Sequence, residues 1–154
     1  MDFFDLIRAG NIEEIKQQVE GDQSLLNTPD SKGFSPLILA CYVNQEDVVK
    51  YLLEEGVPVN GRDVMGNTAL MGVAFKGNVS IAKLLLEHGA DINLQNKKKE
   101  TALIYAVSFA QASMAKTLLE AGADKTLVAE NGNTAADYAE FKGLSELVTL
   151  LSKY

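Results

Sequence analysis

The chain has 154 residues and a formal net charge of −7. Such an acidic balance argues against general binding to nucleic acid, whose phosphates need a basic face, and against adsorption to an anionic membrane. The N-terminus shows no basic segment followed by an apolar run, no stretch has the length of a membrane span, and the single cysteine cannot form an intramolecular disulfide. We therefore expect a cytoplasmic protein that binds neither nucleic acid nor membrane.

A pattern recurs along the chain every 33 residues. Gly33, Gly66 and Gly132 share one position of the pattern, and Lys99 takes that position in the third copy. Two residues further on, each copy carries a residue that can cap a helix, namely Ser35, Thr68, Thr101 and Thr134. A period of this length predicts a stack of repeats, each of which buries its apolar face only against its neighbours.

The period divides 1–154, taken as one domain, into five units. They are an N-terminal capping unit at 1–29, full repeats at 30–62, 63–95 and 96–128, and a C-terminal capping unit at 129–154. The two end units have a polar outer face, as an open-ended stack requires for solubility.

Each full repeat is predicted to hold two short helices. In the second full repeat, Thr68 is expected to cap a helix over 69–76, which Gly77 ends in left-handed backbone. A second helix over 79–88 carries leucines on its apolar side and stops at Gly89. Small residues in the first helices, Ala40, Ala74 and Ala106, should allow neighbouring repeats to pack closely.

The repeated residues resemble the ankyrin repeat family. The motif of that family is matched by Gly33-Phe34-Ser35-Pro36-Leu37, by Gly66-Asn67-Thr68-Ala69-Leu70 and by Leu118-Leu119-Glu120-Ala121-Gly122-Ala123-Asp124. The resemblance implies an all-α solenoid of stacked helix–loop–helix units, with hairpin loops that project from the stack and line a concave face together with the first helices. The sequences of the repeats are similar to those of bacterial members of the family. The motif histidine is replaced by Ile38, Met71, Ile104 and Asp137.

The chain offers little for catalysis. It has one histidine, His88, expected at the surface, and one cysteine, Cys41, expected to be a buried inert thiol. A tetrahedral zinc site would need two further carboxylates from distant units, and no glycine-rich phosphate loop is present. We expect no enzyme, no metal and no cofactor.

Lys97, Lys98 and Lys99 form the one dense basic cluster. The cluster is typical of a solvated hairpin tip, but it could also dock an acidic segment of a partner. Lys99 replaces a glycine that is expected to be left-handed, a conformation that costs other residues about 1–2 kcal/mol. Ala110 and Thr126 also depart from the pattern, so the third repeat has either turns of another shape or local strain.

A second candidate site lies near the ends of the first helices, where apolar and basic residues align between repeats. These residues are Tyr42, Val43, Phe75, Lys76, Ser108, Phe109, Phe141 and Lys142, to which the hairpins add Phe34, Val64 and Met65. Aromatic side chains in a partly exposed strip are typical of binding hot spots. Alternatively, rings such as Phe75 and Phe141 simply cover the alanine-rich groove between repeats.

The sequence therefore predicts a non-catalytic protein–protein interaction module that acts as a scaffold, adaptor or inhibitor. We expect a monomer that binds another protein on the concave face, through Phe34, Tyr42, Val43, Val64, Met65, Phe75, Lys76, Lys97, Lys98, Phe109, Phe141 and Lys142. One alternative is self-association through the same strip. Another is that the chain is a substrate, because Leu85 and Asp91-Ile92-Asn93 resemble an ankyrin site of an asparaginyl hydroxylase, with Asn93 as the acceptor.

Overall fold

The computed structural model describes residues 1–154 and contains ten α-helices, one 3-10 helix and no β-strand. The α-helices are α1 Phe3–Ala9, α2 Ile12–Gly21, α3 Pro36–Tyr42, α4 Glu46–Glu54, α5 Ala69–Lys76, α6 Val79–Glu87, α7 Ala102–Ser108, α8 Ala112–Glu120, α9 Ala135–Phe141 and α10 Ser145–Ser152. The 3-10 helix η1 spans Gln23–Asn27.

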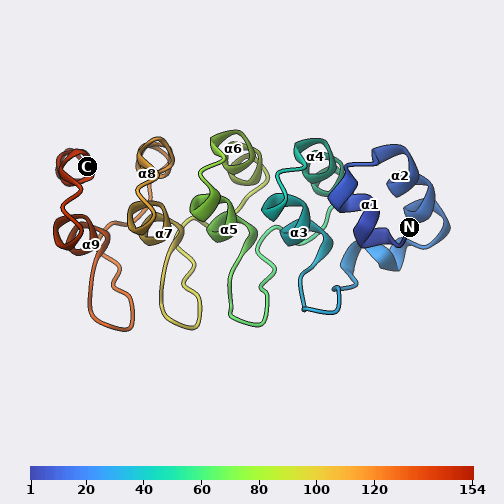
Figure 1. Cartoon of the computed structure of the whole chain (residues 1–154), viewed down its shortest axis with the longest axis horizontal. Helices are drawn as coiled ribbons and strands as arrows, with labels where there is room; N and C mark the ends of the chain where they lie inside the picture. The colour runs from blue at the N-terminus through green and yellow to red at the C-terminus, as the bar shows by residue number, and fades with distance from the viewer.

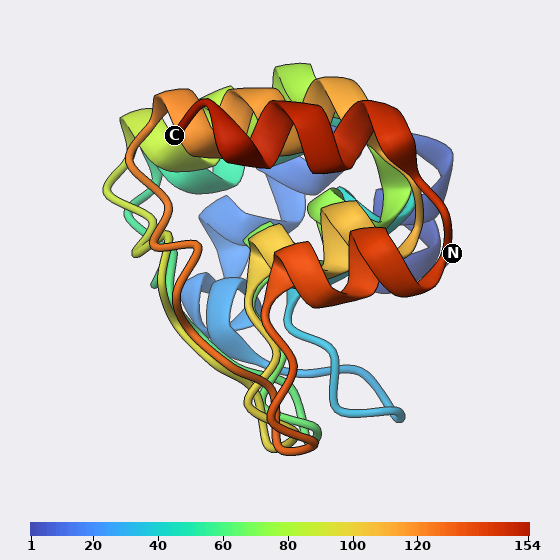
Figure 2. The same ribbon diagram turned by 90° about the vertical axis from the view of Figure 1, so that its left-hand side faces the viewer.

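The helices come in pairs that stack side by side along the molecule, with the two termini at opposite ends (Figure 1). The first helices of the pairs form one layer and the second helices form another, while long loops project from the side of the first helices (Figure 2). The predicted all-α stack of helix–loop–helix units is thus confirmed. The unit boundaries placed at residues 30, 63, 96 and 129 remain a prediction.

Each first helix begins where the sequence placed a capping side chain. The hydroxyl oxygens of Ser35, Thr68, Thr101 and Thr134 all accept a hydrogen bond from the backbone N–H three residues further on. Such a bond satisfies one of the free donors at a helix start. In the second full repeat, α5 has the predicted bounds and ends at left-handed Gly77. The following helix, α6, ends one residue earlier than predicted, because His88 is its C-terminal cap.

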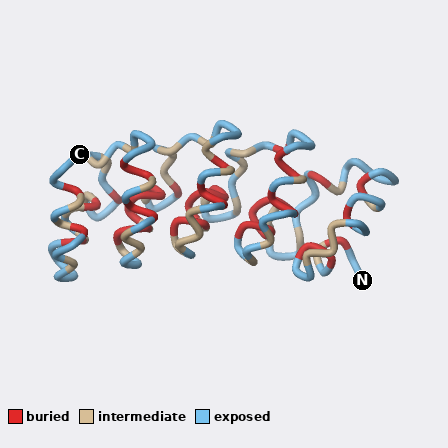
Figure 3. Tube along the Cα trace, turned by 90° about the horizontal axis from the view of Figure 1, so that it is seen from above, coloured by how far each residue is buried: buried red, intermediate tan, exposed pale blue.

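The apolar side chains of both layers form one continuous core of 38 buried residues. Figure 3 shows these buried segments in red, running through the stack from unit to unit. Leu70 and Leu103 are buried between repeats, and Ala40, Ala74 and Ala106 are fully buried. Because each repeat buries its surface only against its neighbours, these leucines and alanines hold the stack together.

The turns of the third full repeat keep the backbone shape of the other repeats. Lys99 has φ +59° and Ala110 has φ +56°, so both residues occupy the left-handed region that glycine adopts at the matching positions. Of the two explanations left open by the sequence, altered turn shape is therefore wrong for these positions, and local strain is correct.

Candidate partner-binding surface

Side chains at the ends of the first helices touch from one repeat to the next. The Nζ of Lys76 lies 4.5 Å from the centre of the Tyr42 ring, which is a cation–π contact. One repeat further on, the Phe75 and Phe109 rings meet edge to face with 4.5 Å between their centres. In both contacts the partners are 34 residues apart in the sequence.

The third full repeat and the C-terminal unit also touch at these positions, but through other groups. The Nζ of Lys142 donates a hydrogen bond of 2.7 Å to the carbonyl oxygen of Ser108 and lies 5.7 Å from the centre of the Phe109 ring. The aligned residues predicted from the sequence therefore form one connected row, which we call the aromatic strip. It consists of Tyr42, Val43, Phe75, Lys76, Ser108, Phe109, Phe141 and Lys142.

Exposure differs along the aromatic strip. Tyr42 and Phe109 are 51% and 49% exposed, and Phe141 is 91% exposed. Phe75 and Val43 are half-buried. Phe75 thus helps to cover the space between repeats, whereas Tyr42 and Phe109 leave about half of their surface in solvent and Phe141 leaves nearly all of it.

The four projecting loops end in hairpin tips, which we number 1 to 4. They span 30–34, 63–67, 96–100 and 129–133, and two backbone hydrogen bonds close each tip. Tips 2 and 3 are joined by a bond from Lys97 N to Met65 O of 3.1 Å. Tips 3 and 4 are joined by a bond from Glu130 N to Lys98 O of 2.9 Å. Tips 2, 3 and 4 therefore form one connected surface.

Two side chains at matching repeat positions clamp these three tips. Nη1 of Arg62 donates to the carbonyl oxygens of Gly66, at 3.1 Å, and Gln95, at 2.7 Å. Nε2 of Gln95 donates to the carbonyl oxygens of Lys99, at 2.9 Å, and Val128, at 3.0 Å. Each clamp, the last residue of its own repeat, bonds two carbonyls of the next repeat, one in the tip and one just before the following tip.

Tip 1 lies apart from the others. Figure 2 shows its light-blue loop diverging from the three overlaid loops of tips 2, 3 and 4. Pro29 occupies the repeat position that Arg62 and Gln95 occupy in the later repeats. Its side chain has no hydrogen-bond donor, so it cannot form the clamp. No backbone hydrogen bond joins tip 1 to tip 2. Phe34 of tip 1 is half-buried against the core.

Beside the junction between tips 1 and 2, a surface pocket of about 320 Å³ lies between η1 and the first full repeat, and no residue of the second full repeat lines it. Gly61 lines this pocket and stands where the later repeats carry Leu94 and Leu127, both half-buried. The missing leucine leaves space that the other lining residues do not fill, namely Leu26, Asn27, Ser35, Leu37, Val57, Pro58 and Arg62.

A polar network that sequence reasoning missed connects tips 2 and 3. Nδ2 of the buried Asn96 lies 2.8 Å from Oδ1 of Asn67, 3.2 Å from Oε1 of Glu100 and 3.1 Å from the hydroxyl of Tyr105. Oδ1 of Asn96 accepts from the backbone N–H groups of Lys98 and Glu100, both at 2.9 Å. The sequence does carry a signal for this network, because Asn96 occupies the position at which tips 1 and 2 have an aspartate.

Tyr105 extends this network to the aromatic strip. Its ring stacks on Phe109 with 6.3 Å between the centres. Burial, followed by the nearby charge of Glu100, raises the pKa of Tyr105 to about 12, so that its hydroxyl stays protonated at neutral pH. Hairpin tips and aromatic strip are therefore one connected structure in the third repeat.

The lysines of tip 3, Lys97, Lys98 and Lys99, are all exposed, and none forms an ion pair. Beside them on tip 2, Val64 and Met65 are exposed apolar side chains. The structure thus places the basic cluster and part of the predicted apolar surface on adjacent tips.

The remaining sequence candidates lie away from this surface. His88 is exposed, and its Nδ1 lies 2.9 Å from the carbonyl oxygen of Leu84. Cys41 is buried, and burial raises the pKa of its thiol well above the usual range, which disfavours the reactive thiolate. Asn93 is exposed, but its Oδ1 accepts a bond of 2.8 Å from the N–H of Asp124. Modification of Asn93 remains a prediction.

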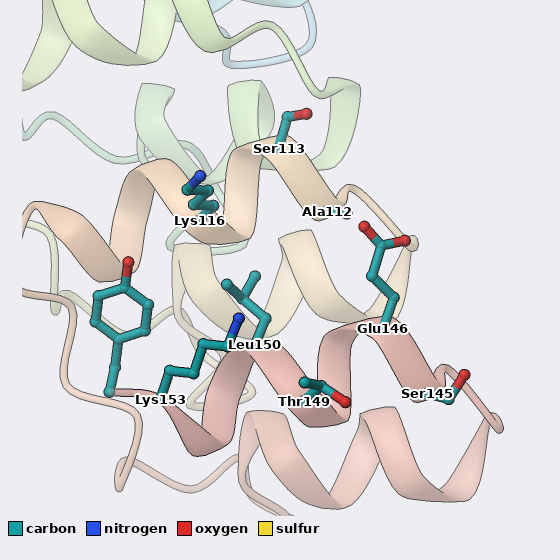
Figure 4. Close-up of a pocket in the computed structure, with 9 residues that line it drawn as sticks. Ala112, Ser113, Lys116, Ser145, Glu146, Thr149, Leu150 and Lys153 are labelled. Carbon is teal, nitrogen blue, oxygen red and sulfur yellow. The ribbon is translucent and has the colours of Figure 1, made fainter.

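The layer of second helices carries a shallow groove of about 700 Å³ between α8 and α10, which the sequence did not predict (Figure 4). Small side chains, including Ser113, Ser145 and Thr149, leave this space between the two helices. Lys116 and Lys153 lie toward one end of it (Figure 4), and Tyr154 also lines it.

No helix of the structure combines the length and the apolar character needed to cross a membrane. Nowhere do three His, Cys, Asp or Glu side chains come together in an arrangement that could hold a metal ion.

A family model described as ankyrin repeats in three copies matches residues 3–96 and again 70–154. The chain therefore belongs to the ankyrin repeat family.

Similar proteins share only a part of their length with this chain. The human 26S proteasome non-ATPase regulatory subunit 10 is 36% identical over 61 residues, which are 40% of this chain and 27% of that protein. NF-kappa-B inhibitor alpha of Sus scrofa is 40% identical over 57 residues, 37% of this chain and 18% of that protein. BTB/POZ domain-containing protein 3 of Schizosaccharomyces pombe is 37% identical over 65 residues, 42% and 12% respectively.

Proposed function

We propose that the chain is a non-catalytic interaction module that binds a partner protein on the face formed by the first helices and the hairpin tips. The observation that carries this proposal is the exposure of Tyr42 and Phe109, whose rings are held by contacts with side chains of neighbouring repeats. Large aromatic side chains left half in solvent are typical of binding hot spots.

The contacts along the aromatic strip support the proposal energetically. Lys76 holds the Tyr42 ring, and Phe75 and Tyr105 flank the Phe109 ring, so both rings are already ordered before binding. A partner that docks on ordered rings loses little conformational entropy in the complex. The clamps of Arg62 and Gln95 order the hairpin tips in the same way.

The names of two relatives, a regulatory subunit and an inhibitor, are consistent with a role in which binding itself is the activity. By analogy, we propose that this chain acts as a scaffold, adaptor or inhibitor of a protein partner and performs no catalysis. Fold alone does not identify that partner.

Affinity capture from the native cell tests the proposal. Wild-type protein and a Tyr42→Ala/Phe109→Ala variant are compared, with Tyr154→Ala as the matched control, because Tyr154 is 48% exposed but lies outside the strip. We expect a partner that the wild type and the control retain and the double variant loses. If all three proteins retained the partner equally, the aromatic strip would not be the binding site. If the wild type retained no partner at all, the proposed interaction module would be wrong.

Self-association is the second candidate, because Phe141 is almost fully exposed at the end of the strip. Phe141 occupies the repeat position of Phe75, whose ring contacts Phe109 of the following repeat. In a self-associated form, a second copy of the chain would supply the matching contact for Phe141. Light scattering after size-exclusion chromatography separates the candidates: we expect a monomer for the wild type, whereas a dimer that Phe141→Ala dissociates would favour self-association.

A further inference from the structure

We propose that tips 2 and 3 together dock an extended acidic segment of the partner, with carboxylates on the lysines of tip 3 and an apolar residue on Val64 and Met65. This inference rests on the proposed function, since it specifies the chemistry of the partner on the same face. It concerns the hairpin tips alone and is independent of the aromatic strip.

The first argument is charge. The chain carries a net charge of −7, yet three consecutive ammonium groups stand at one tip without an ion pair. The carboxylates around them are engaged in the tips themselves: Glu100 bonds to Asn96, and Asp63 accepts from two backbone N–H groups of its own tip. Only Glu130 of tip 4 is exposed beside them. Tip 3 is therefore complementary to acidic groups from outside the chain.

The second argument is the backbone position of Lys99. At the matching positions of the other tips, Gly33, Gly66 and Gly132 have φ of +86°, +79° and +84°. Lys99 has φ +59° in the same turn, although its Cβ makes this conformation unfavourable. A glycine would fit this turn more easily, and Lys99 retains the third ammonium group of the basic cluster at that backbone cost.

The third argument is that the surface is already ordered. The backbone bond between Lys97 and Met65 fixes the lysines beside the apolar residues of tip 2, and the bond between Lys98 and Glu130 supports tip 3 from the other side. Ordered charges next to exposed apolar side chains can select a segment that carries both acidic and apolar residues. The overall negative charge of the chain disfavours a nucleic acid or an anionic membrane as the occupant.

A displayed library of random peptides, selected on the wild-type protein, provides the probe. Selected sequences are made as soluble peptides, and their dissociation constants are measured by fluorescence anisotropy for the wild type and for Lys97→Glu/Lys98→Glu. The matched control is Lys50→Glu/Lys83→Glu, which reverses the same charges at exposed positions of α4 and α6.

We expect selected peptides that are rich in Asp and Glu around an apolar residue. Their affinity should fall about tenfold or more in Lys97→Glu/Lys98→Glu, remain unchanged in the control, and weaken with added salt. Lys99→Gly should weaken the peptides about two- to threefold while it raises the melting temperature, because it removes a charge and the backbone strain together.

Selected peptides without acidic residues, or equal affinity for Lys97→Glu/Lys98→Glu, would overturn the proposal. Vesicles rich in phosphatidylserine form a competing arm, and binding of these vesicles that depends on Lys97 and Lys98 would also overturn it. Because the proposed function is judged by capture with the Tyr42/Phe109 variant, the two proposals can fail separately.

Discussion

The junction between tips 1 and 2 differs from the two junctions that follow it, although all four tips recur with the same period of 33 residues. At the later junctions, Arg62 or Gln95 bonds a carbonyl of the next repeat, and a backbone hydrogen bond joins the tips. At the first junction Pro29 supplies no clamp and tip 1 diverges (Figure 2), and beside it Gly61 lines a pocket between η1 and the first full repeat. The repeat period thus determines the helices, while single side chains determine how the hairpins associate.

Because of this difference, the candidate surface has two parts, one formed by tips 2, 3 and 4 and the other by tip 1. Tips 2, 3 and 4 present a connected and ordered face, which includes the basic cluster. Tip 1 contributes Phe34, half-buried on its own repeat. The following changes test whether the clamps and the missing leucine are the cause.

The largest effect is expected from shortening a core leucine at a well-packed junction. Leu103→Ala should cost roughly 2–5 kcal/mol, towards the upper end, because its neighbours cannot collapse into the space. Leu37→Ala should cost less, since Leu37 already lines the pocket beside the first junction. Urea denaturation followed by circular dichroism measures both losses. Equal losses would show that the first junction is packed as well as the others.

Removal of a clamp should have the next largest effect. Gln95→Ala deletes two hydrogen bonds that hold tips 3 and 4, and each contributes about 1 kcal/mol, so we expect a loss of about 2 kcal/mol. Amide hydrogen exchange gives an internal control. The N–H of Glu130 bonds to tip 3, whereas the matching N–H of Val64 has no such bond to tip 1. In Gln95→Ala, exchange at Glu130 should approach the rate at Val64, and an unchanged rate would mean that the clamp is not needed.

Filling the pocket should stabilise the region beside the first junction. Gly61 has no positive φ, and a Cβ there would meet only ordinary contacts with Pro58, so a side chain can be added without strain. Gly61→Leu should raise the free energy of unfolding by about 1 kcal/mol. Gly61→Ala serves as the control for backbone entropy alone, and it should give a smaller gain. A gain no larger for leucine than for alanine would show that the pocket does not accept the side chain.

The smallest effect is expected from the hydroxyl that links tips 2 and 3 to the aromatic strip. Tyr105→Phe removes the bond from Asn96 and the long bond that the hydroxyl donates to Asn67, but it leaves Asn96 bonded to Asn67 and Glu100, so the cost should be about 0.5–1 kcal/mol. Tyr138→Phe is the matched control at the same repeat position, where the hydroxyl accepts from the exposed Asn131. Thermal unfolding should separate the two variants, and a greater loss at Tyr138 would contradict the role of the network.

Much of the fold was predictable, because capping and helix termination are local. Thr68 and Gly77 bounded α5 as expected, and only the end of α6 at Glu87 differed by one residue. The candidate surface was predictable as a set of aligned positions. Its contacts were not, because a repeat alignment places Tyr42 beside Phe75, whereas the stack brings Tyr42 to Lys76 and Phe75 to Phe109. Such diagonal contacts depend on how neighbouring repeats are placed in three dimensions.

The sequence by itself determined the family, the helix pairs and the N-terminal caps Ser35, Thr68, Thr101 and Thr134, because these depend on a period and on interactions within a few residues. It also identified Lys99 as a departure from the pattern. Only the tertiary structure decided that the turn at Lys99 keeps its left-handed shape, that tips 2, 3 and 4 associate without tip 1, and that Asn96 and Tyr105 join the tips to the strip. The association of the tips depends on contacts between groups about a repeat apart in sequence, and the other two features depend on how a turn and a side chain are placed in three dimensions, which a repeat pattern does not specify.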